Sequence, residues 1–361
     1  MARKTRSAVL KEPGRIVIEE FDIPEIGPEE GLLKIEMCGI CATDPKAYHG
    51  KFDWLKLPVI LGHEVVGYIE EVGEIAAERW GVHQGDRVVT DPGTPCSYCH
   101  YCRSGMFRWC QNRLSWRVPC TRPPYLWGGY GEYQYLAPGA QVSKVSRDIA
   151  PEAAALINAV VANCIQWVRV AGGTSIGDAV VILGVGAQGL AATMAAKEAG
   201  ASPIIITGLT SDEPRFKLAK RFGADYNINV EKDDIIKRVN ELTDGKRADV
   251  VVDVSGNPKA IAQAVDLVRT QGTVVYAGLV GSDVSVPLAI DKIVLSEIRV
   301  QGVYNHEHEA MKAAIKLVES GKYPVEEIIS HTFPLRQAEE AVKVAGGEIP
   351  GIRPIRAAIV P

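Results

Sequence analysis

Four cysteines lie within fifteen residues of one another, and this spacing constrains the fold more than any other feature of the sequence. They form the pattern C-x2-C-x2-C-x7-C and are Cys96, Cys99, Cys102 and Cys110. Four thiolates this close in the chain can form one tetrahedral shell, as a structural zinc site requires. A closed shell stabilises a lobe but leaves no coordination position open for a reaction. The alternative is four reduced thiols; the spacing is too compact for the two knuckles of a nucleic-acid zinc ribbon.

Length and charge indicate a globular protein of two domains without general affinity for polyanions. At 361 residues the chain is long for one hydrophobic core. Its formal net charge of −4 gives no attraction to nucleic acid or anionic membranes. No apolar run is long enough to cross a bilayer, and the basic N-terminal segment lacks the apolar stretch of a secretory signal. Eight cysteines in such a chain favour metal ligands or buried thiols over disulfides, so we expect a cytoplasmic location.

The pattern of apolar residues changes near residue 150. Before it, Gly and Pro separate short strands without long helices, which is typical of a barrel-like β domain. These strands are expected at 7–10, 15–19, 32–37, 65–72 and 86–89. After it, a helix at 151–171 precedes apolar strands that alternate with helices, which indicates a parallel sheet covered on both faces. These strands are expected at 179–183, 203–207, 248–253 and 273–277, with helices at 190–199 and 215–222.

The last part of the chain adds an edge strand and a return to the first domain. A strand at 297–303 is expected at the edge of the parallel sheet, where a second chain could pair with it. A helix at 308–320 and a short strand at 357–360 then follow. The sequence therefore predicts an α/β protein with a β-rich domain, 1–155 and 305–361, and a doubly wound parallel-sheet domain, 156–304.

A G-x-G-x-x-G turn follows the first strand of the parallel sheet and opens a helix. Gly184 makes the tight turn, Gly186 lets a pyrophosphate approach the backbone, and Gly189 lets the helix pack on the strand. The N-terminus of the helix offers free N–H groups to phosphates. The context favours dinucleotide binding over a glycine-rich structural turn. The residues expected to line the cofactor site here and after the later strands are Gly184, Gly186, Gln188, Gly189, Ser255 and Gly278.

The end of the second strand bears on the choice between NAD and NADP. An acidic residue is expected there to hold the ribose 2′-hydroxyl of NAD, but Gly208 occupies the position. Without that charge, a 2′-phosphate could be bound by Arg215 together with Thr210 and Ser211. Asp212 could instead reach the ribose from a longer loop, so both cofactors stay open.

Cys41, His63 and Glu64 are candidates for a second metal site. Each alone is weak evidence, because a lone cysteine is more often a buried apolar residue, as we expect for Cys38, and a lone histidine a core residue. With a dinucleotide fold downstream they predict a catalytic metal site. A thiolate, an imidazole and one carboxylate would leave a fourth position for water or substrate.

Together these motifs resemble those of medium-chain, zinc-dependent alcohol dehydrogenases, nearest the sorbitol and threonine dehydrogenase branch. The resemblance covers nearly the whole chain and rests on 41–44, 62–64, the four-cysteine lobe, 129–133 and 184–189. It implies a GroES-like catalytic domain, a Rossmann cofactor domain, two zinc ions per chain and NAD or NADP. It also implies hydride transfer between an alcohol and the nicotinamide, and a homodimer or homotetramer formed through the late edge strand.

The resemblance also implies individual roles. Cys41 and His63 would bind the catalytic zinc, with Glu64 as a ligand or a nearby exchange ligand. Thr43 would relay the alcohol proton, and Asp44 would orient His63.

Two departures from the family pattern leave roles open. Asn158 stands where a further Cys, Glu or Asp ligand is usual. An amide is a poor zinc ligand, so we expect Asn158 to hold water or substrate, which favours Cys41, His63, Glu64 and water as the shell. Lys46 stands where the proton relay often ends at a histidine, with His49 nearby, so the last proton step is open.

Substrate identity is weakly encoded. Most aromatic residues near the expected pocket should be core or interface residues, but Trp54 and Trp116 in the pocket would favour a bulky secondary or cyclic alcohol over ethanol. The aromatic residues are Tyr48, Phe52, Trp54, Trp116, Tyr125 and Trp127. The alternatives are a zinc-free quinone or enoyl reductase of the same fold and a cofactor-binding protein without turnover. The presence of Cys41 and His63 argues against both.

Overall fold

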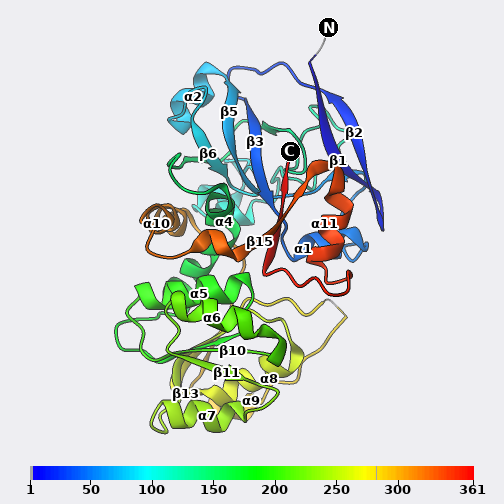
Figure 1. Cartoon of the computed structure of the whole chain (residues 1–361). Coiled ribbons are helices and arrows are strands. Elements are labelled where there is room, and N and C mark those ends of the chain that lie inside the picture. Colours follow the sequence, from blue (N-terminus) through cyan, green and yellow to red (C-terminus); the bar gives the residue numbers. More distant parts are fainter. Residues whose placement is uncertain (1–2, 282) are drawn as a thin grey trace. The chain divides into compact units, whose positions relative to one another are not determined.

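The computed structural model describes residues 3–281 and 283–361, and the chain forms two compact units (Figure 1). The first unit comprises Met1–Ala159, Ile315–Gly321 and Val325–Pro361. The second comprises Val160–Ala314 and Lys322–Pro324. The chain therefore returns to its first unit at Ile315 and, apart from Lys322–Pro324, stays in it to Pro361.

The first unit is β-rich, as predicted. Its larger sheet has the order β15-β16-β3-β5-β6-β8, with β7 paired to β3. The strands are β3 (Gly31–Gly39), β5 (Glu64–Val72), β6 (Arg87–Thr90), β7 (Tyr133–Leu136), β8 (Val142–Lys144), β15 (Ile329–Pro334) and β16 (Arg356–Val360). A second sheet has the order β2-β1-β4, with strands β1 (Lys4–Glu12), β2 (Arg15–Asp22) and β4 (Val59–Ile60). Its core is formed by apolar residues of both sheets, such as Leu10, Leu33 and Ile69.

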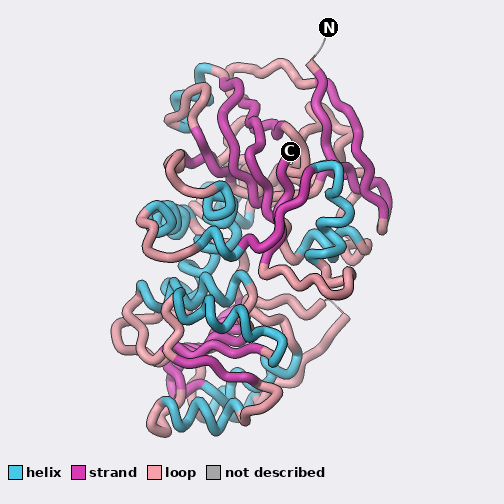
Figure 2. Tube along the Cα trace, in the orientation of Figure 1, coloured by secondary structure: helices cyan, strands magenta, loops and turns pink. Residues whose placement is uncertain are grey.

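The short helices of the first unit lie between these strands. They are α1 (Thr43–Tyr48), α2 (Glu74–Trp80), α3 (His100–Arg103), α4 (Pro151–Leu156) and α11 (Ala338–Ala345). Among the described residues, short 3₁₀ turns occur at Phe107–Trp109, Thr210–Asp212, Val325–Ile328 and Leu335–Gln337. Figure 2 shows how loops connect these short elements. Cys102 lies in α3, and the segments on either side of this helix carry Cys96, Cys99 and Cys110.

The second unit contains the predicted parallel sheet. All its strands are parallel, in the order β11-β10-β9-β12-β13-β14. They are β9 (Val180–Leu183), β10 (Ile204–Gly208), β11 (Tyr226–Asn229), β12 (Ala248–Asp253), β13 (Val268–Tyr276) and β14 (Arg299–Gly302). In chain order this is 3-2-1-4-5-6, the Rossmann arrangement, whose ligand crevice lies where the order reverses. The crevice is therefore expected at the carboxyl ends of β9 and β12.

Helices cover the sheet because its strands are apolar on both faces. On one face, Val181 and Val251 pack against α7 and α8 residues such as Val239 and Val265. Asp234 and Asn257 begin these two helices by accepting hydrogen bonds from backbone N–H groups of the first turn. The helices of this unit are α5 (Ala187–Glu198), α6 (Glu213–Arg221), α7 (Ile235–Leu242), α8 (Pro258–Leu267) and α9 (Ile290–Leu295) (Figure 1). Helix α10 (His308–Glu319) begins in this unit and continues into the first unit from Ile315.

The helix predicted at 151–171 is present but is not α-helical throughout. Pro151 opens it as α4, and π-helical segments follow at Ile157–Ala162 and Ile165–Ala171. A π-turn widens a helix locally and often marks a functional position. Asn158 lies in the first of these segments.

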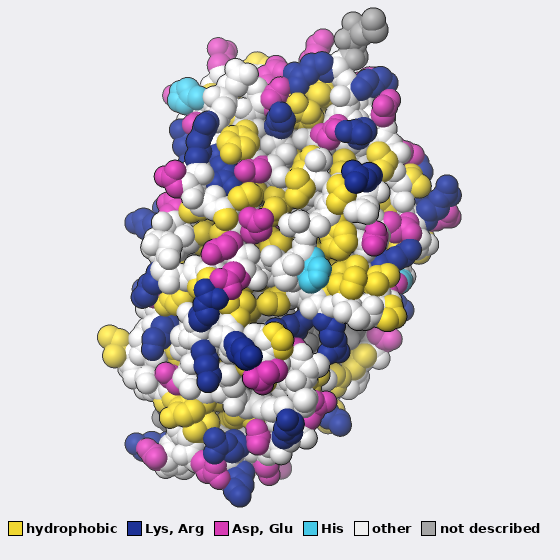
Figure 3. Space-filling view, viewed as in Figure 1, with side chains coloured by type: hydrophobic (Ala, Val, Ile, Leu, Met, Phe, Trp, Pro, Cys, Tyr) yellow, Lys and Arg dark blue, Asp and Glu magenta, His cyan; other side chains and the backbone are white. Residues whose placement is uncertain are grey.

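The surface agrees with the charge balance. Acidic and basic side chains are interspersed over the face shown in Figure 3, without a large area of one sign. Among the described residues, no helix combines the length and the apolarity that crossing a bilayer would need.

Candidate functional site

Cys41, His63 and Glu64 come together in the first unit although they lie on separate segments. Cys41 follows β3, His63 directly precedes β5, and Glu64 begins β5; antiparallel pairing of Gly39 with Glu64 aligns these strand ends. One ligand atom from each of the three residues lies within 4.8 Å of the other two. A thiolate, an imidazole and a carboxylate at this spacing form a donor set that fits zinc.

Asp44 lies between the segment that carries Cys41 and the segment that carries His63. It is fully buried, and its Oδ2 accepts hydrogen bonds from the Cys41 backbone N–H at 2.8 Å and from the Tyr130 hydroxyl at 2.8 Å. Its Oδ1 lies 3.7 Å from His63 Nδ1. Burial raises the pKa of Asp44 to about 7, although the His63 ring acts in the opposite direction. A cation bound to His63 would favour the ionised carboxylate, so the buried acid fits a metal site.

Glu64 forms a buried ion pair with Arg356 that the sequence did not reveal. Arg356 Nε donates to Glu64 Oε2 at 3.1 Å, and Nη2 donates to Oε1. Burial lowers the pKa of the guanidinium, but Glu64, Cys41 and Asp44 together raise it above its usual value. Each carboxylate oxygen has two lone pairs, so Glu64 can accept from Arg356 and still face a metal. No spacing signal connects residues this far apart in the chain.

The residues predicted for the proton relay differ in their surroundings. Thr43 begins α1, and its Oγ1 is buried with no hydrogen-bond partner among the described residues. It is therefore available to a bound alcohol. His49 Nε2 lies 2.7 Å from Glu348 Oε1 and is exposed. Lys46 is half-buried on the same helix.

Asn158 is held in one orientation by its neighbours. Its Nδ2 donates to the Thr90 carbonyl at 2.5 Å and to Asp91 Oδ1 at 3.1 Å. Its Oδ1 is buried and has no hydrogen-bond partner within the described chain. Because Nδ2 donates to two oxygen acceptors, the orientation of the Asn158 amide is fixed. Its Oδ1 is therefore left as an acceptor for a ligand or water.

A small cavity reaches His63 inside the first unit. It has a volume of about 30 Å³ and is lined by residues that include His63, Asp91, Trp116 and Gln134. Gln134 Oε1 is buried without a hydrogen-bond partner among the described residues. Space for a water molecule needs about 10–15 Å³ and two or more polar partners, and this cavity meets both conditions.

Aromatic rings extend away from His63. The Trp116 ring stacks on the His63 ring with centroids 5.4 Å apart and an interplanar angle of 16°. Trp54 meets Trp116 edge-on at 6.4 Å, and Phe52 stacks on Trp54 at 4.8 Å. Tyr48, in contrast, is buried and donates to the Gly14 carbonyl. The structure therefore places Trp116, but not Tyr48, against a metal-binding candidate.

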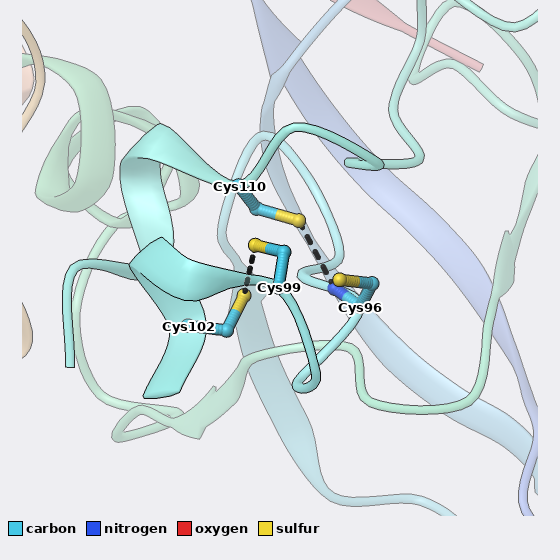
Figure 4. Close-up of side chains that lie close together, drawn as sticks. All are labelled: Cys96, Cys99, Cys102 and Cys110. Atoms are coloured by element: carbon cyan, nitrogen blue, oxygen red, sulfur yellow. Dashed lines mark hydrogen bonds between the residues drawn. The ribbon is translucent and has the colours of Figure 1, made fainter. Parts of the chain in front are cut away.

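The four cysteines of the lobe converge, as Figure 4 shows. Their sulfur atoms lie within 4.8 Å of one another. The Cys96 backbone N–H donates to Cys110 Sγ at 3.2 Å, and Cys99 Sγ lies 3.5 Å from Cys102 Sγ. Burial raises the pKa of the Cys96 thiol, but the backbone N–H groups of Tyr98 and Cys99 lower it more, to about 6. Four sulfurs in this arrangement fit a closed zinc shell.

The glycines of the nucleotide turn occupy the positions that the motif requires. A Cβ added at Gly189 would lie 1.9 Å from the Gly184 carbonyl oxygen, so only glycine allows this helix and strand to pack. A Cβ at Gly186 would meet open space, which leaves room for a phosphate. Gln188, inside the turn, accepts hydrogen bonds from the Cys164 thiol at its carbonyl and at Oε1.

Ser255 and Gly278 lie beside this turn. A Cβ at Gly184 would be 3.1 Å from Ser255 Cβ, and Ser255 Oγ donates to Asp253 Oδ1 at 2.6 Å. A Cβ at Gly278 would be 2.5 Å from Asp253 Oδ2. The structure therefore brings the predicted cofactor residues of β9, β12 and β13 to one edge of the sheet.

Gly208 and Arg215 do not form an open site for a 2′-phosphate. A Cβ at Gly208 would be 2.6 Å from Val185 Cγ1 and 2.9 Å from the Phe216 ring. The side-chain position that an acid would use is therefore already filled. Arg215 Nη1 lies 3.1 Å from Asp212 Oδ1, and Asp212 Oδ2 accepts from the Leu209 backbone N–H. A phosphate would have to compete with Asp212 for this arginine.

Both units match known protein families. Residues 27–147 match the alcohol dehydrogenase GroES-like domain, and residues 187–320 match the zinc-binding dehydrogenase family. A "probable alcohol dehydrogenase" of Mycobacterium tuberculosis is 40% identical over 99% of this chain and 98% of its own length. An erythritol/L-threitol dehydrogenase of Mycolicibacterium smegmatis is 35% identical over 96% of this chain and 95% of its own.

Solved structures agree with these matches. An alcohol dehydrogenase from Thermotoga maritima superposes with a TM-score of 0.90 at 26% identity, covering 99% of this chain and 100% of that one. An NADP-bound zinc-binding dehydrogenase from Sinorhizobium meliloti gives a TM-score of 0.88 at 26% identity, covering 99% and 100%. The donor sets, the GroES-like and Rossmann units and these relatives lead to one conclusion: the chain belongs to the zinc-dependent medium-chain dehydrogenases and is an NAD(P)-dependent alcohol oxidoreductase.

Proposed function

We propose that this dehydrogenase interconverts a bulky or cyclic secondary alcohol and its ketone at a zinc ion held by Cys41, His63 and Glu64. The observation that carries the proposal is the convergence of these three donors within 4.8 Å, with the Trp116 ring stacked on His63. Cys96, Cys99, Cys102 and Cys110 would hold a second, structural zinc.

The side chains around the donors suit alcohol chemistry. When bound, zinc lowers the pKa of the alcohol and the nicotinamide accepts the hydride. Thr43 Oγ1, buried and without another hydrogen-bond partner in the described chain, receives the alcohol proton. Asp44 Oδ1 faces His63 Nδ1 at 3.7 Å, and a closer approach with the metal bound would fix the tautomer of the ring. We assign the onward proton step to Lys46, which lies on the same helix as Thr43.

Glu64 has two partners to satisfy in this scheme. Arg356 neutralises its charge at all times, which weakens it as a metal donor relative to a free carboxylate. We propose that Glu64 would hold the zinc together with Cys41 and His63, and that its ion pair with Arg356 would let it turn away from the metal to make room for substrate. Asn158 Oδ1, a buried acceptor without a partner among the described residues, would bind the displaced water or a substrate hydroxyl.

The aromatic rings support the substrate class. Phe52, Trp54 and Trp116 form a continuous wall that begins at His63. Trp54 is half exposed, at 50%, and the Arg117 guanidinium lies 4.3 Å from its ring centroid. A flat apolar wall favours a ring or a branched chain over ethanol.

The cofactor turn supports nicotinamide dinucleotides as a class. Gly184, Gly186, Gln188, Gly189, Ser255 and Gly278 would line the pyrophosphate and nicotinamide path. Because Arg215 is already paired with Asp212, we propose that NAD is used at least as well as NADP.

The test is an activity screen with metal analysis. The purified protein is expected to contain two zinc ions and to oxidise cyclohexanol-like or aryl secondary alcohols faster than ethanol or polyols, with NAD⁺ and NADP⁺ compared in parallel. Cys41→Ser and His63→Ala should each lose one zinc and the activity. A protein with one zinc in the cysteine lobe only, or a clear preference for ethanol, would contradict the proposal.

We further propose a homodimer that pairs two copies of β14. Every residue of β14 is exposed, and the strand pairs only with β13 within the described chain. Neighbouring apolar side chains are also exposed, including Val294 at 66% and Leu295 at 84%. Exposed edges of this kind usually pair or aggregate. Light scattering should give twice the mass of the chain, and Val300→Lys with Leu295→Lys should give monomers; an unchanged mass would refute this interface.

A cytoplasmic setting fits the thiol chemistry. All eight cysteines are free in the structure, and each lies in one of the two donor clusters or in the core. Both proposed metal sites need reduced thiolates, which the cytoplasm maintains.

A further inference from the structure

Tyr130 contacts both segments that carry the proposed catalytic zinc ligands. Its backbone N–H donates to the Leu61 carbonyl at 2.9 Å. A Cβ placed on Gly62 would lie 2.4 Å from Tyr130 Cδ1, so the ring packs directly against the residue that precedes His63. On the other side, its hydroxyl donates to Asp44 Oδ2 at 2.8 Å.

The hydroxyl donates to one oxygen of a carboxylate that is buried away from water. Tyr130 and Asp44 are both fully buried. Asp44 Oδ2 accepts from Tyr130 and from the Cys41 backbone N–H, and Oδ1 faces His63 Nδ1 at 3.7 Å, where neither atom has a hydrogen-bond partner among the described residues. The two donors on Oδ2 set the rotation of the carboxylate, and that rotation places Oδ1 opposite the imidazole, so that a small movement would allow it to accept from Nδ1.

We propose that Tyr130 is a positioning residue for the catalytic metal. It fixes Asp44, which orients His63, and it holds the His63 segment against the Cys41 segment. The inference rests on the ligand assignment proposed above. It assigns a role to the hydroxyl of Tyr130, whereas a purely structural tyrosine would need only its ring.

The test removes the hydroxyl and keeps the ring. Tyr130→Phe is compared with Tyr135→Phe, which deletes an equivalent bond in the same unit: the Tyr135 hydroxyl donates to Glu30 Oε1 at 2.7 Å, and the side chain is also buried. Zinc affinity is measured by competition with a chromophoric chelator, and Co²⁺ loaded into the catalytic site reports the ligand geometry by its visible spectrum.

Tyr130→Phe is expected to weaken the catalytic zinc by roughly 10- to 100-fold, the usual effect of losing a partner behind a metal ligand. The cobalt spectrum should shift, and zinc in the cysteine lobe should be unaffected. Tyr135→Phe should change neither the affinity of the catalytic zinc nor the cobalt spectrum. Thermal unfolding of both metal-free variants shows whether stability is matched.

Two results would overturn the inference. One is a Tyr130→Phe protein with the zinc affinity and cobalt spectrum of the unmodified chain. The other is an equal loss of zinc in both variants, which would indicate a general loss of stability. Failure of the proposed function appears elsewhere, as a Cys41→Ser protein that keeps both zinc ions.

Discussion

At the residue scale, Gly62 shows how closely the metal-binding loop is packed. Its φ of +92° disfavours any side chain, and a Cβ would lie 2.4 Å from the Tyr130 ring. Gly62→Ala should therefore lower the free energy of unfolding by about 2–4 kcal/mol, from backbone strain together with overpacking. Gly81→Ala is the control, because Gly81 also has a positive φ, +64°, but a Cβ there meets open space. Denaturant unfolding should show a clearly smaller loss for Gly81→Ala; equal losses would contradict the steric part.

Asn158 illustrates why an amide replaces the acid that is usual at its position. A carboxylate there would face the Thr90 carbonyl and the Asp91 carboxylate, which now accept hydrogen bonds from Nδ2. Asn158→Asp should lower the unfolding free energy of the metal-free protein by about 2–4 kcal/mol, because two hydrogen bonds become repulsive contacts. Asn227→Asp, which loses a single bond of 3.3 Å to the Phe216 carbonyl at a half-buried site, should cost less. If the metal-free Asn158→Asp protein is as stable as the unmodified chain, the hydrogen bonds of Asn158 with Thr90 and Asp91 do not contribute to the free energy of unfolding.

Some site residues could be predicted from the sequence and others could not, for physical reasons. The four lobe cysteines are recognisable because donor type and local spacing carry the chemistry. Cys41 and His63 are recognisable only in combination with the dinucleotide-binding turn downstream. The ion pair of Glu64 with Arg356 spans 292 positions. It depends on β16 lying beside β3, which no local pattern encodes. The hydroxyl of Tyr130 likewise gains its role only from the tertiary contact with Asp44.

At the scale of elements, the strands of the parallel sheet were predictable because strands buried on both faces must be continuously apolar. The β9 sequence Val180–Leu183 and the β12 sequence Ala248–Asp253 are clear examples. The π-helical segments Ile157–Ala162 and Ile165–Ala171 were not predicted. Helical periodicity gives the extent of a helix, but packing decides whether a turn closes at the fourth or the fifth residue.

The end of β10 gives a prediction at this scale. A Cβ at Gly208 would be 2.6 Å from Val185 Cγ1, so Gly208→Ala should lower the unfolding free energy by about 1–3 kcal/mol. Gly302, the last residue of β14 in the same sheet, has open space around its Cβ position and serves as control. Gly208→Asp would suffer the same clash, so a change in its cofactor preference would not report the charge alone. If thermal unfolding shows the same loss of stability for Gly208→Ala and Gly302→Ala, the close approach of Val185 to Gly208 is contradicted.

At the scale of the whole molecule, the two metal sites should differ in how readily they lose zinc. With zinc bound, the three proposed catalytic donors would leave a coordination position open, whereas the lobe would surround its ion with four sulfurs. Mild chelation should therefore remove one zinc together with all activity, while the lobe keeps the other. Zinc content and activity followed over time check this, with unfolding expected only after the second ion leaves. Simultaneous release of both ions would contradict it.

The chain distance between donors also orders biosynthesis. The lobe cysteines span fifteen residues, so a ribosome-bound fragment that has exposed Cys110 already holds every sulfur it needs to capture an ion. In the catalytic donor set, the charge of Glu64 is neutralised only when Arg356 leaves the ribosome, 292 positions later in the chain. During translation in zinc-poor medium, we therefore expect the zinc of the four-cysteine lobe to be acquired first. The protein made under these conditions would be folded but would lack the catalytic zinc.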